Sequence, residues 1–442
     1  MGQRGRQTGL AERIEIGERW SKGQNDPEIA ATMGLSAGVV RKWRRKYQQT
    51  GRSGLVSRLG RPAQGALSQS LPQFQETVQT MRETHPGWGP LTILSELAKD
   101  EQWAKMKLPS RSRVAAFLKE LQLTRKYERH SALPHPPAVQ PHRPHEEWEV
   151  DAQGVIPVTG LGKVSIINIG DLFSRVKIDS WPCLNRSHPN TQDYQLVLRR
   201  AFIQYGLPER ISFDHDSVFY DNTTASPFPT NLHLWLIALG IAVRFIEHAP
   251  PEEHSVIERS HQTVTNQAIR GQSFSQVTAL QQSLTQRLDF LNNYFPSRSL
   301  GGQPPLVLWP QAAHSGRPYR LEWEPELLNM QRVYAYLAQG HWFRLTSTQG
   351  QFSLGGQCYN VGTALARQTL EITFEPQEAQ FNILLPDGSQ SLRLSPLALT
   401  KNNLMGELSP FLSFPVYQLA LPFSVAEWRQ LFLANHLTGT TL

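Results

Sequence analysis

The stretch Trp148-Glu149-Val150-Asp151-Ala152 begins a strand that runs to about residue 158, and it decides the fold of the central part of the chain. Further apolar runs follow it in a regular order. They predict strands at 164–169, 176–181, 210–214 and 242–246, and helices at 190–205, 232–239, 252–270 and 274–294. Three strands in a row, followed by strands that alternate with helices, predict an α/β layer with a mixed five-stranded sheet.

Three acidic residues stand out in this central segment: Asp151 in the first strand, Asp214 at the end of the fourth, and Glu258 within a helix. Hard divalent cations such as Mg²⁺ take oxygen ligands. Two such ions about 4 Å apart can stabilise both the attacking and the leaving oxygen of a phosphoryl displacement. Each acid taken alone could equally be a surface carboxylate or a helix cap, so their positions by themselves are a weak signal.

Local strings around these acids carry a resemblance to a known family. They are Trp148-Glu149-Val150-Asp151, Asp171-Leu172-Phe173-Ser174-Arg175, Ile211-Ser212-Phe213-Asp214, and Pro251-Glu252-Glu253-His254-Ser255-Val256-Ile257-Glu258-Arg259-Ser260-His261-Gln262-Thr263. With them, residues 148–309 resemble the catalytic core of the DDE transposases in the retroviral-integrase superfamily, which has an RNase H-like fold. The N-terminal helical domains resemble those of bacterial insertion-sequence transposases in the same superfamily.

The resemblance implies an enzyme and a set of site residues. Asp151, Asp214 and Glu258 would be both the catalytic residues and the ligands of two Mg²⁺ (or Mn²⁺) ions in each active site. The implied activity is that of a polynucleotidyl transferase, which cuts DNA at the terminal repeats of a mobile element and joins the freed strand to target DNA.

The chain departs from the family pattern in three places. His215-Asp216 follows the second Asp, and His254-Ser255 precedes the Glu, where the family usually has Asn-Gly. The interval from Asp214 to Glu258 holds 43 residues, more than is usual, and the surplus reads as a loop at 220–231. Asp216 is thus a rival for the second ligand, although the family spacing to Phe219 favours Asp214.

Residues close to Glu258 on the predicted helix are candidates for contact with DNA. His261 and Gln262 lie three and four residues after Glu258, and therefore on the same face. His261 could approach the scissile phosphate or orient a carboxylate, but it could equally be a packed helix histidine. Arg259 points about 100° away from Glu258, toward the DNA backbone or a structural carboxylate.

The positive charge of the chain is concentrated at the N-terminus. Residues 1–130 carry 23 Lys and Arg against 12 Asp and Glu, whereas the whole chain carries 44 against 37. Such asymmetry is typical of an N-terminal region that binds nucleic acid, although a solvated basic surface would also account for it.

Residues 10–50 predict three short helices in a helix-turn-helix arrangement. Asn25 and Glu28 form a capping box around Pro27, Gly34 ends the second helix, and Ser36 caps the third. The third helix carries basic residues that can contact bases and phosphates: Arg41, Lys42, Arg44 and Arg45. The alternative is a three-helix domain that binds a protein.

Two further basic segments follow. Arg58 and Arg61 lie in a Gly- and Arg-containing strip at 51–66, which either enters a minor groove or is an ordinary linker. Residues 70–128 predict a second helical domain, with Arg111 and Arg113 in the first turn of its last helix. We expect this domain to bind DNA as well.

The expected domains follow the changes in composition. A helix-turn-helix domain with its linker occupies 1–66 and a second helical domain 67–128. An extended Pro- and His-rich linker follows at 129–146, and its four histidines lack the spacing of a metal site. The RNase H-like core occupies 147–310, and a small β-barrel of short strands, one of them at 333–337, occupies 311–392. A tail with one helix at 425–435 occupies 393–442.

Composition narrows the cellular setting. Cys183 and Cys358 are the only cysteines, too few for a disulfide framework or a four-thiolate zinc site. The longest apolar run, 235–243, is too short to span a membrane. We therefore expect a prokaryotic cytoplasmic protein that associates with the nucleoid.

These observations favour a DDE transposase over two alternatives. Its partners would be double-stranded DNA, both element ends and target, and at least one further copy of the chain, since joining two ends requires two active sites. The first alternative is a catalytically degenerate transposase that binds specific DNA without cutting it. The second, a nuclease acting on RNA hybrids, does not explain two double-stranded DNA readers.

Overall fold

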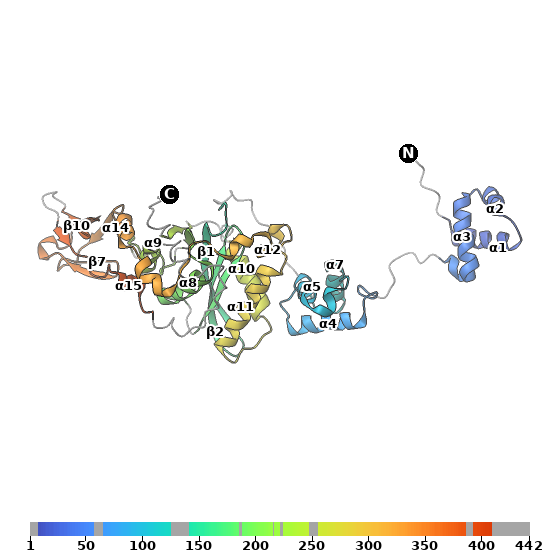
Figure 1. The fold of residues 1–442 in the computed structure, drawn as a ribbon, viewed down its shortest axis with the longest axis horizontal. Helices are drawn as coiled ribbons and strands as arrows, with labels where there is room; N and C mark the ends of the chain where they lie inside the picture. The colour runs from blue at the N-terminus through green and yellow to red at the C-terminus, as the bar shows by residue number, and fades with distance from the viewer. Residues whose placement is uncertain are drawn as a thin grey trace. The chain divides into compact units, whose positions relative to one another are not determined.

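The computed structural model describes residues 8–56, 65–124, 141–184, 188–214, 216–221, 224–246, 255–385 and 392–408. The chain divides into two compact units, Met1–Ser70 and Leu71–Leu442, whose helices and strands are labelled in Figure 1. Within the described ranges, no helix has both the length and the apolar composition needed to cross a membrane.

The first unit is a small bundle of three helices with a short 3₁₀ segment: α1 (Leu10–Ser21), α2 (Asp26–Met33), α3 (Ala37–Thr50) and η1 (Gly51–Leu55). The predicted caps are present. Asn25 accepts a hydrogen bond from the Glu28 amide, and the Glu28 side chain accepts one from the Asn25 amide. Gly34, with a φ of 63°, ends α2, and Ser36 caps α3. Apolar side chains from all three helices form its core.

The second unit opens with four helices: α4 (Pro72–Thr84), α5 (Pro90–Lys99), α6 (Glu101–Ala104) and α7 (Arg111–Glu120). They pack on the sheet-containing part of the unit through the turn before α5. The Trp88 indole donates to the backbone oxygen of Gln267 at 3.1 Å, and Arg287 pairs with Glu96. A Cβ on Gly87 would overlap the backbone oxygen of Asn266, so only glycine fits there.

The predicted five-stranded sheet is confirmed. Its strands are β1 (Glu147–Val158), β2 (Gly162–Asp171), β3 (Lys177–Leu184), β4 (Arg210–Phe213) and β5 (Ala242–Phe245). Their order is β3-β2-β1-β4-β5. Strands β1, β2 and β3 pair antiparallel, whereas β4 runs parallel to both β1 and β5. This is the mixed topology that the order of strands and helices in the sequence predicted.

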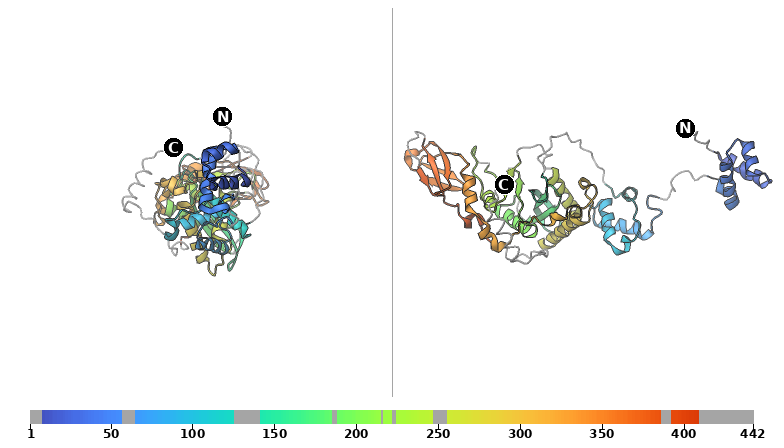
Figure 2. Two further views of the ribbon diagram at one scale, coloured as in Figure 1. Left: turned by 90° about the vertical axis from the view of Figure 1, so that its right-hand side faces the viewer. Right: turned by 45° about the horizontal axis from the view of Figure 1, so that its top comes forward.

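Helices cover both faces of this sheet (Figures 1 and 2). They are α8 (Thr191–Tyr205), α9 (Asn231–Ala238), α10 (Ser255–Val264), the π-helical η2 (Thr265–Ile269) and α11 (Val277–Asn293). One apolar cluster joins α8 and α9 to one face, and it contains Ile167. The other joins α10, η2 and α11 to the opposite face, and it contains Ile166. The alternation along β2 explains the continuous apolar run in the sequence.

The remainder of the second unit differs in part from the prediction. Its helical segments are η3 (Arg298–Leu300), α12 (Pro305–Leu308), η4 (Pro310–Ala313), η5 (Leu321–Trp323), α13 (Glu324–Leu327), α14 (Met330–Leu337), η6 (Thr363–Leu365) and α15 (Lys401–Met405). The strand predicted at 333–337 is wrong, because these residues end α14. Val333 and Leu337 are both buried and lie one helical turn apart, so the apolar pattern is a helical stripe.

Six short strands follow α14: β6 (Trp342–Leu345), β7 (Gln351–Leu354), β8 (Gln357–Asn360), β9 (Thr369–Glu375), β10 (Gln380–Leu384) and β11 (Leu392–Leu394). They form a four-stranded sheet, β11-β10-β9-β6, and a separate β7-β8 hairpin. The described strands therefore do not show one closed barrel. The helix predicted at 425–435 lies outside the described residues.

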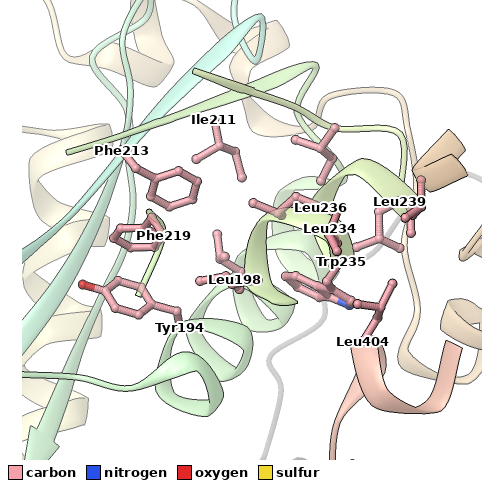
Figure 3. Packing of buried hydrophobic residues seen from close by; sticks show 14 of the residues in the cluster. Tyr194, Leu198, Ile211, Phe213, Phe219, Leu234, Trp235, Leu236, Leu239 and Leu404 are labelled. Atoms are coloured by element: carbon pink, nitrogen blue, oxygen red, sulfur yellow. The ribbon is translucent and has the colours of Figure 1, made fainter. Parts of the chain in front are cut away.

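A buried ion pair ties this C-terminal part to the sheet domain. Arg199 of α8 and Glu324 of α13 have side chains 1% and 0% exposed. Glu324 also accepts hydrogen bonds from the Trp235 indole at 2.9 Å and from the Tyr319 hydroxyl. Trp235 lies on α9 within the apolar cluster shown in Figure 3. The pair and the Trp235 indole thus join the helices α8, α9 and α13.

We expect Glu324→Gln to destabilise the second unit by about 3–5 kcal/mol, because it leaves the buried Arg199 guanidinium without a counter-charge. Urea denaturation followed by tryptophan fluorescence would measure the loss. Glu378→Gln is the matched control, since Glu378 pairs with Arg393 at the surface and should cost less than about 1 kcal/mol. Equal effects of the two substitutions would contradict this account.

The end of the predicted linker is packed rather than solvated. His145 is 3% exposed. Its Nδ1 accepts a hydrogen bond from the Trp148 indole at 3.1 Å, and its Nε2 lies 3.0 Å from the backbone oxygen of Ala312. An indole can only donate and a carbonyl can only accept, so both contacts require the neutral ring protonated on Nε2. Burial accordingly lowers the pKa of His145 to about 4.

This histidine predicts a loss of stability in mild acid. The pKa of His145 in the folded protein lies below its value of about 6.5 in the unfolded chain. The contribution of His145 to the free energy of unfolding is therefore fully present above about pH 6.5 and is lost as the pH falls toward 4. We expect His145 alone to make the free energy of unfolding about 2 kcal/mol smaller at pH 5 than at pH 7. His145→Gln should flatten this dependence in urea titrations at the two pH values, and an unchanged slope would contradict the assignment.

Candidate active site

The sheet brings Asp151 and Asp214 to the same edge. Strands β1 and β4 pair in parallel from Glu147 opposite Arg210 to Glu149 opposite Ser212. Continuing this register by two residues places Asp151 opposite Asp214. Side chains alternate along a strand, so both carboxylates lie on the face that also carries Glu149 and Ser212. Neighbouring strands are about 4.8 Å apart, a separation that two carboxylates can bridge with one cation.

Aromatic packing fixes the end of β4. Phe213, directly before Asp214, stacks on Phe219 with 4.0 Å between ring centroids, and Tyr194 meets Phe219 edge-on at 4.6 Å (Figure 3). Burial raises the pKa of Tyr194, and the charges of Asp216, Asp151 and Asp214 raise it further. The three carboxylates therefore act on one hydroxyl, as expected if they cluster at this edge.

The structure separates the roles of the two competing acids after β4. The Asp216 carboxylate accepts hydrogen bonds from the Val218 amide at 3.1 Å and from the Ser217 hydroxyl at 3.2 Å. Its backbone oxygen accepts from the amides of Phe219 and Tyr220. Asp216 thus caps the turn after β4, and the Asp214 carboxylate in turn accepts a hydrogen bond from the Asp216 amide at 3.2 Å. His215 lies outside the described residues.

Helix α10 places His261 against the first aspartate. His261 Nε2 lies 3.7 Å from the Asp151 carboxylate, and the residue is 9% exposed. Burial and the charge of Lys177 lower the pKa of His261 to about 4. This position fits the alternatives in which His261 orients a carboxylate or packs within the helix, and it is far less accessible than a DNA-contacting residue should be.

Glu258 occupies the exposed first turn of α10, one turn before His261. Residues 247–254, including His254, lie outside the described part of the chain. Within the described ranges, no three His, Cys, Asp or Glu side chains are grouped so that they could hold one metal ion. The structure thus brings His261 to Asp151 and pairs the strands that lead to Asp151 and Asp214, but it does not group the predicted triad around one ion. The donor chemistry of the two aspartates suits Mg²⁺ or Mn²⁺.

Sequence reasoning missed Lys177, a cation close to His261. Its ammonium donates to the Ser260 hydroxyl at 3.1 Å, and burial lowers its pKa to about 8. The available signal was a lysine at the start of a strand whose residues are mostly buried. Arg259, on the other side of α10, is exposed as predicted.

The basic residues of α3 divide into two groups. Arg41, Lys42 and Arg45 are exposed, as contact with DNA requires. Arg44 is half-buried and forms an ion pair with Asp26 of α2 at 2.7 Å, so it also holds the two helices together. The exposed Arg41 lies 3.8 Å from the same carboxylate. Arg58 and Arg61 lie outside the described residues. In the second unit, Arg111 is exposed and Arg113 half-buried in the first turn of α7.

A comparison with known protein families supports the predicted helix-turn-helix domain at the N-terminus. Residues 12–63 match the family described as a helix-turn-helix domain, a motif that typically places its second helix in the major groove of DNA. Among solved structures, the chain is similar to a simian T-cell lymphotropic virus intasome in complex with PP2A regulatory subunit B56 gamma. The identity is 12%, the coverage is 72% of this chain and 96% of that chain, and the TM-score is 0.32.

The catalytic core domain of BIV integrase is a second similar structure. It shares 16% identity over 38% of this chain and 95% of that chain, with a TM-score of 0.27. The chain thus combines a helix-turn-helix domain with an α/β domain that contains a mixed five-stranded sheet.

Proposed function

We propose that this protein is a DDE-type DNA transposase, which binds the ends of a mobile element and joins them to target DNA. The observation that supports the proposal is the parallel pairing of β1 and β4 up to Glu149 and Ser212, which would set Asp151 opposite Asp214 if it continues by two residues. A helix-turn-helix domain in the same chain supports DNA as the substrate.

Asp151 and Asp214, joined by Glu258 from α10, would hold Mg²⁺ or Mn²⁺. A bound ion would supply Lewis-acid stabilisation of the oxygens around the reacting phosphorus. His261 Nε2 lies 3.7 Å from the Asp151 carboxylate and would help to orient it, and the exposed Arg259 would meet a phosphate of the DNA backbone. The exposed basic side chains of α3 would recognise the element end. The working form would be at least a dimer, because two ends must be joined.

A strand-joining assay tests this function. Purified full-length protein is mixed with labelled duplexes taken from the DNA that flanks its own gene, and with a supercoiled target plasmid. We expect label to become covalently attached to the plasmid with Mg²⁺ or Mn²⁺, and none to be attached when EDTA removes the metal. Joining that continues in EDTA would contradict a metal-dependent carboxylate site.

The second candidate is a catalytically degenerate transposase that only binds specific DNA. The exposed position of Glu258 and the absence of a three-residue metal group within the described ranges favour it. The same assay separates the two candidates, because a degenerate protein would retain the flanking duplex in a gel-shift experiment without ever transferring its label to the plasmid.

A further inference from the structure

A cavity of about 390 Å³ lies between the sheet domain and the C-terminal part of the second unit. Its walls come from the turn after β4, the end of β5, α9, α14 and β6, through Tyr220, Phe245, His233, Tyr336 and Trp342. We call these five residues the aromatic pocket. Its volume is within the range of roughly 300–1,000 Å³ that is usual for sites of small organic ligands.

The rings stand around the cavity at angles to one another. Tyr220 meets Phe245 edge-on with 5.2 Å between centroids, and His233 lies 5.3 Å from Phe245 and 5.1 Å from Tyr336. His233 is 5% exposed, and its Nε2 has no hydrogen-bond partner among the described residues. A buried nitrogen without a partner costs free energy.

Polar groups complete the lining. Asp221 carries a carboxylate that faces Arg344 at 3.6 Å, and Gln339 and His341 contribute an amide and an imidazole. Aromatic walls with a few donors and acceptors suit a flat heteroaromatic ring, which stacks by its face and forms hydrogen bonds along its edge. The nucleobases are ligands of this kind.

The pocket adjoins the edge that carries the aspartates. Phe213 of β4 pairs in register with Phe245 of β5, and Asp214 directly follows Phe213. Phe245 in the pocket wall is therefore one strand, or about 4.8 Å, along the sheet from the strand that ends on Asp214. Phe219 also lines the cavity and stacks on Phe213. By the alternation along the strand, Asp214 and the pocket lie on opposite faces at the same end of the sheet, so a nucleotide next to a phosphate held at Asp214 would reach the pocket around the end of β4.

We propose that the aromatic pocket binds an unpaired nucleobase of the DNA strand on which the Asp151–Asp214 edge acts. This inference rests on the function proposed above. Enzymes that act on duplex DNA can extrude a nucleotide into a side pocket, and stacking of a base on aromatic side chains contributes roughly 1–3 kcal/mol. Because every base has a π-face, such a pocket holds the strand in place without reading its sequence.

Binding of two single-stranded probes to the full-length protein tests the inference. One probe is a labelled oligothymidylate of about 12 nucleotides, within the range of single-strand site sizes. The other is an abasic deoxyribose-phosphate chain of the same length, which keeps the phosphates and lacks the bases. Affinity is measured by fluorescence anisotropy for the wild type and for Tyr336→Leu, which removes one stacking ring. Tyr334→Leu is the matched control, since Tyr334 lies on the same helix and packs on Phe374 instead.

We expect Tyr336→Leu to weaken oligothymidylate binding roughly 10- to 100-fold and to leave binding of the abasic chain unchanged. Tyr334→Leu should affect neither probe, and Tyr336→Phe should retain the wild-type affinity because it keeps the ring. Equal losses on both probes, or no loss on either, would overturn the inference.

The two proposals can fail separately. If strand joining is observed and the Tyr336→Leu substitution does not distinguish the two probes, only the pocket assignment is overturned. If the probes are distinguished and strand joining is never observed, base binding is supported, and the proposed enzymatic function fails on its own assay.

Discussion

Replacing Asp214 with Asn is expected to reduce strand joining at least about 1,000-fold, a magnitude typical of losing an essential catalytic group, while binding of DNA ends stays nearly intact. An amide keeps the size of the carboxylate but removes the negative charge that a hard cation requires. The same result is expected for Asp151→Asn and for Glu258→Gln. Joining is measured with labelled ends and a plasmid target, and binding is measured by gel shift with the same duplex.

Asp216→Asn is the informative control for this series. Its carboxylate caps the turn after β4 through the Val218 amide and the Ser217 hydroxyl, and an asparagine side chain can also accept such bonds. We therefore expect Asp216→Asn to retain most of the joining activity. An active Asp214→Asn variant together with an inactive Asp216→Asn variant would show that the second ligand was wrongly chosen.

Binding of DNA through the first unit should depend steeply on salt. A protein that makes several phosphate contacts loses roughly 10³-fold or more in affinity between 50 and 200 mM salt. We expect a loss of this size for the full-length protein with duplex DNA, measured by fluorescence anisotropy. Arg41→Gln combined with Arg45→Gln should weaken binding at low salt and make the slope less steep by about one unit for each contact removed.

The control for this experiment is Arg44→Gln. Arg44 belongs to the same helix but pairs with Asp26, so Arg44→Gln should lower the stability of the first unit more than it changes the salt slope. A flat salt response of the wild type, or an unchanged slope after removal of both Arg41 and Arg45, would contradict DNA binding by this helix.

Much of the fold could be predicted because local patterns and tertiary structure agree. The capping box at Asn25 and the glycine at position 34 fix α2, and the alternation of Ile166 and Ile167 marks a strand that is buried on both faces. The error at Val333 has a simple cause. A short apolar run fits a helix and a strand equally well. Only the structure shows that the buried residues are one helical turn apart, which identifies the helix.

The candidate site could be predicted only in part. Asp151 and Asp214 were identified from the strings around them, and the parallel register of β1 and β4 brings them together. The role of Asp216 depends on hydrogen bonds within one turn, and the burial of His261 depends on how α10 packs against β1. The docking of Trp88 on Gln267 and the aromatic pocket join residues more than 100 positions apart, a relation that local periodicity cannot reveal.

The most direct test of the central claim locates the metal on the polypeptide itself. Fe²⁺ is supplied in place of Mg²⁺ with ascorbate and peroxide, so that radicals formed at the bound ion cut the nearby backbone, and the fragments are identified by mass spectrometry. Cuts next to Asp151, Asp214 and Glu258 are expected, and Asp214→Asn should abolish them. Cuts confined to other parts of the chain, or cuts that persist unchanged in Asp214→Asn, would contradict a metal-dependent strand-joining site at this edge of the sheet.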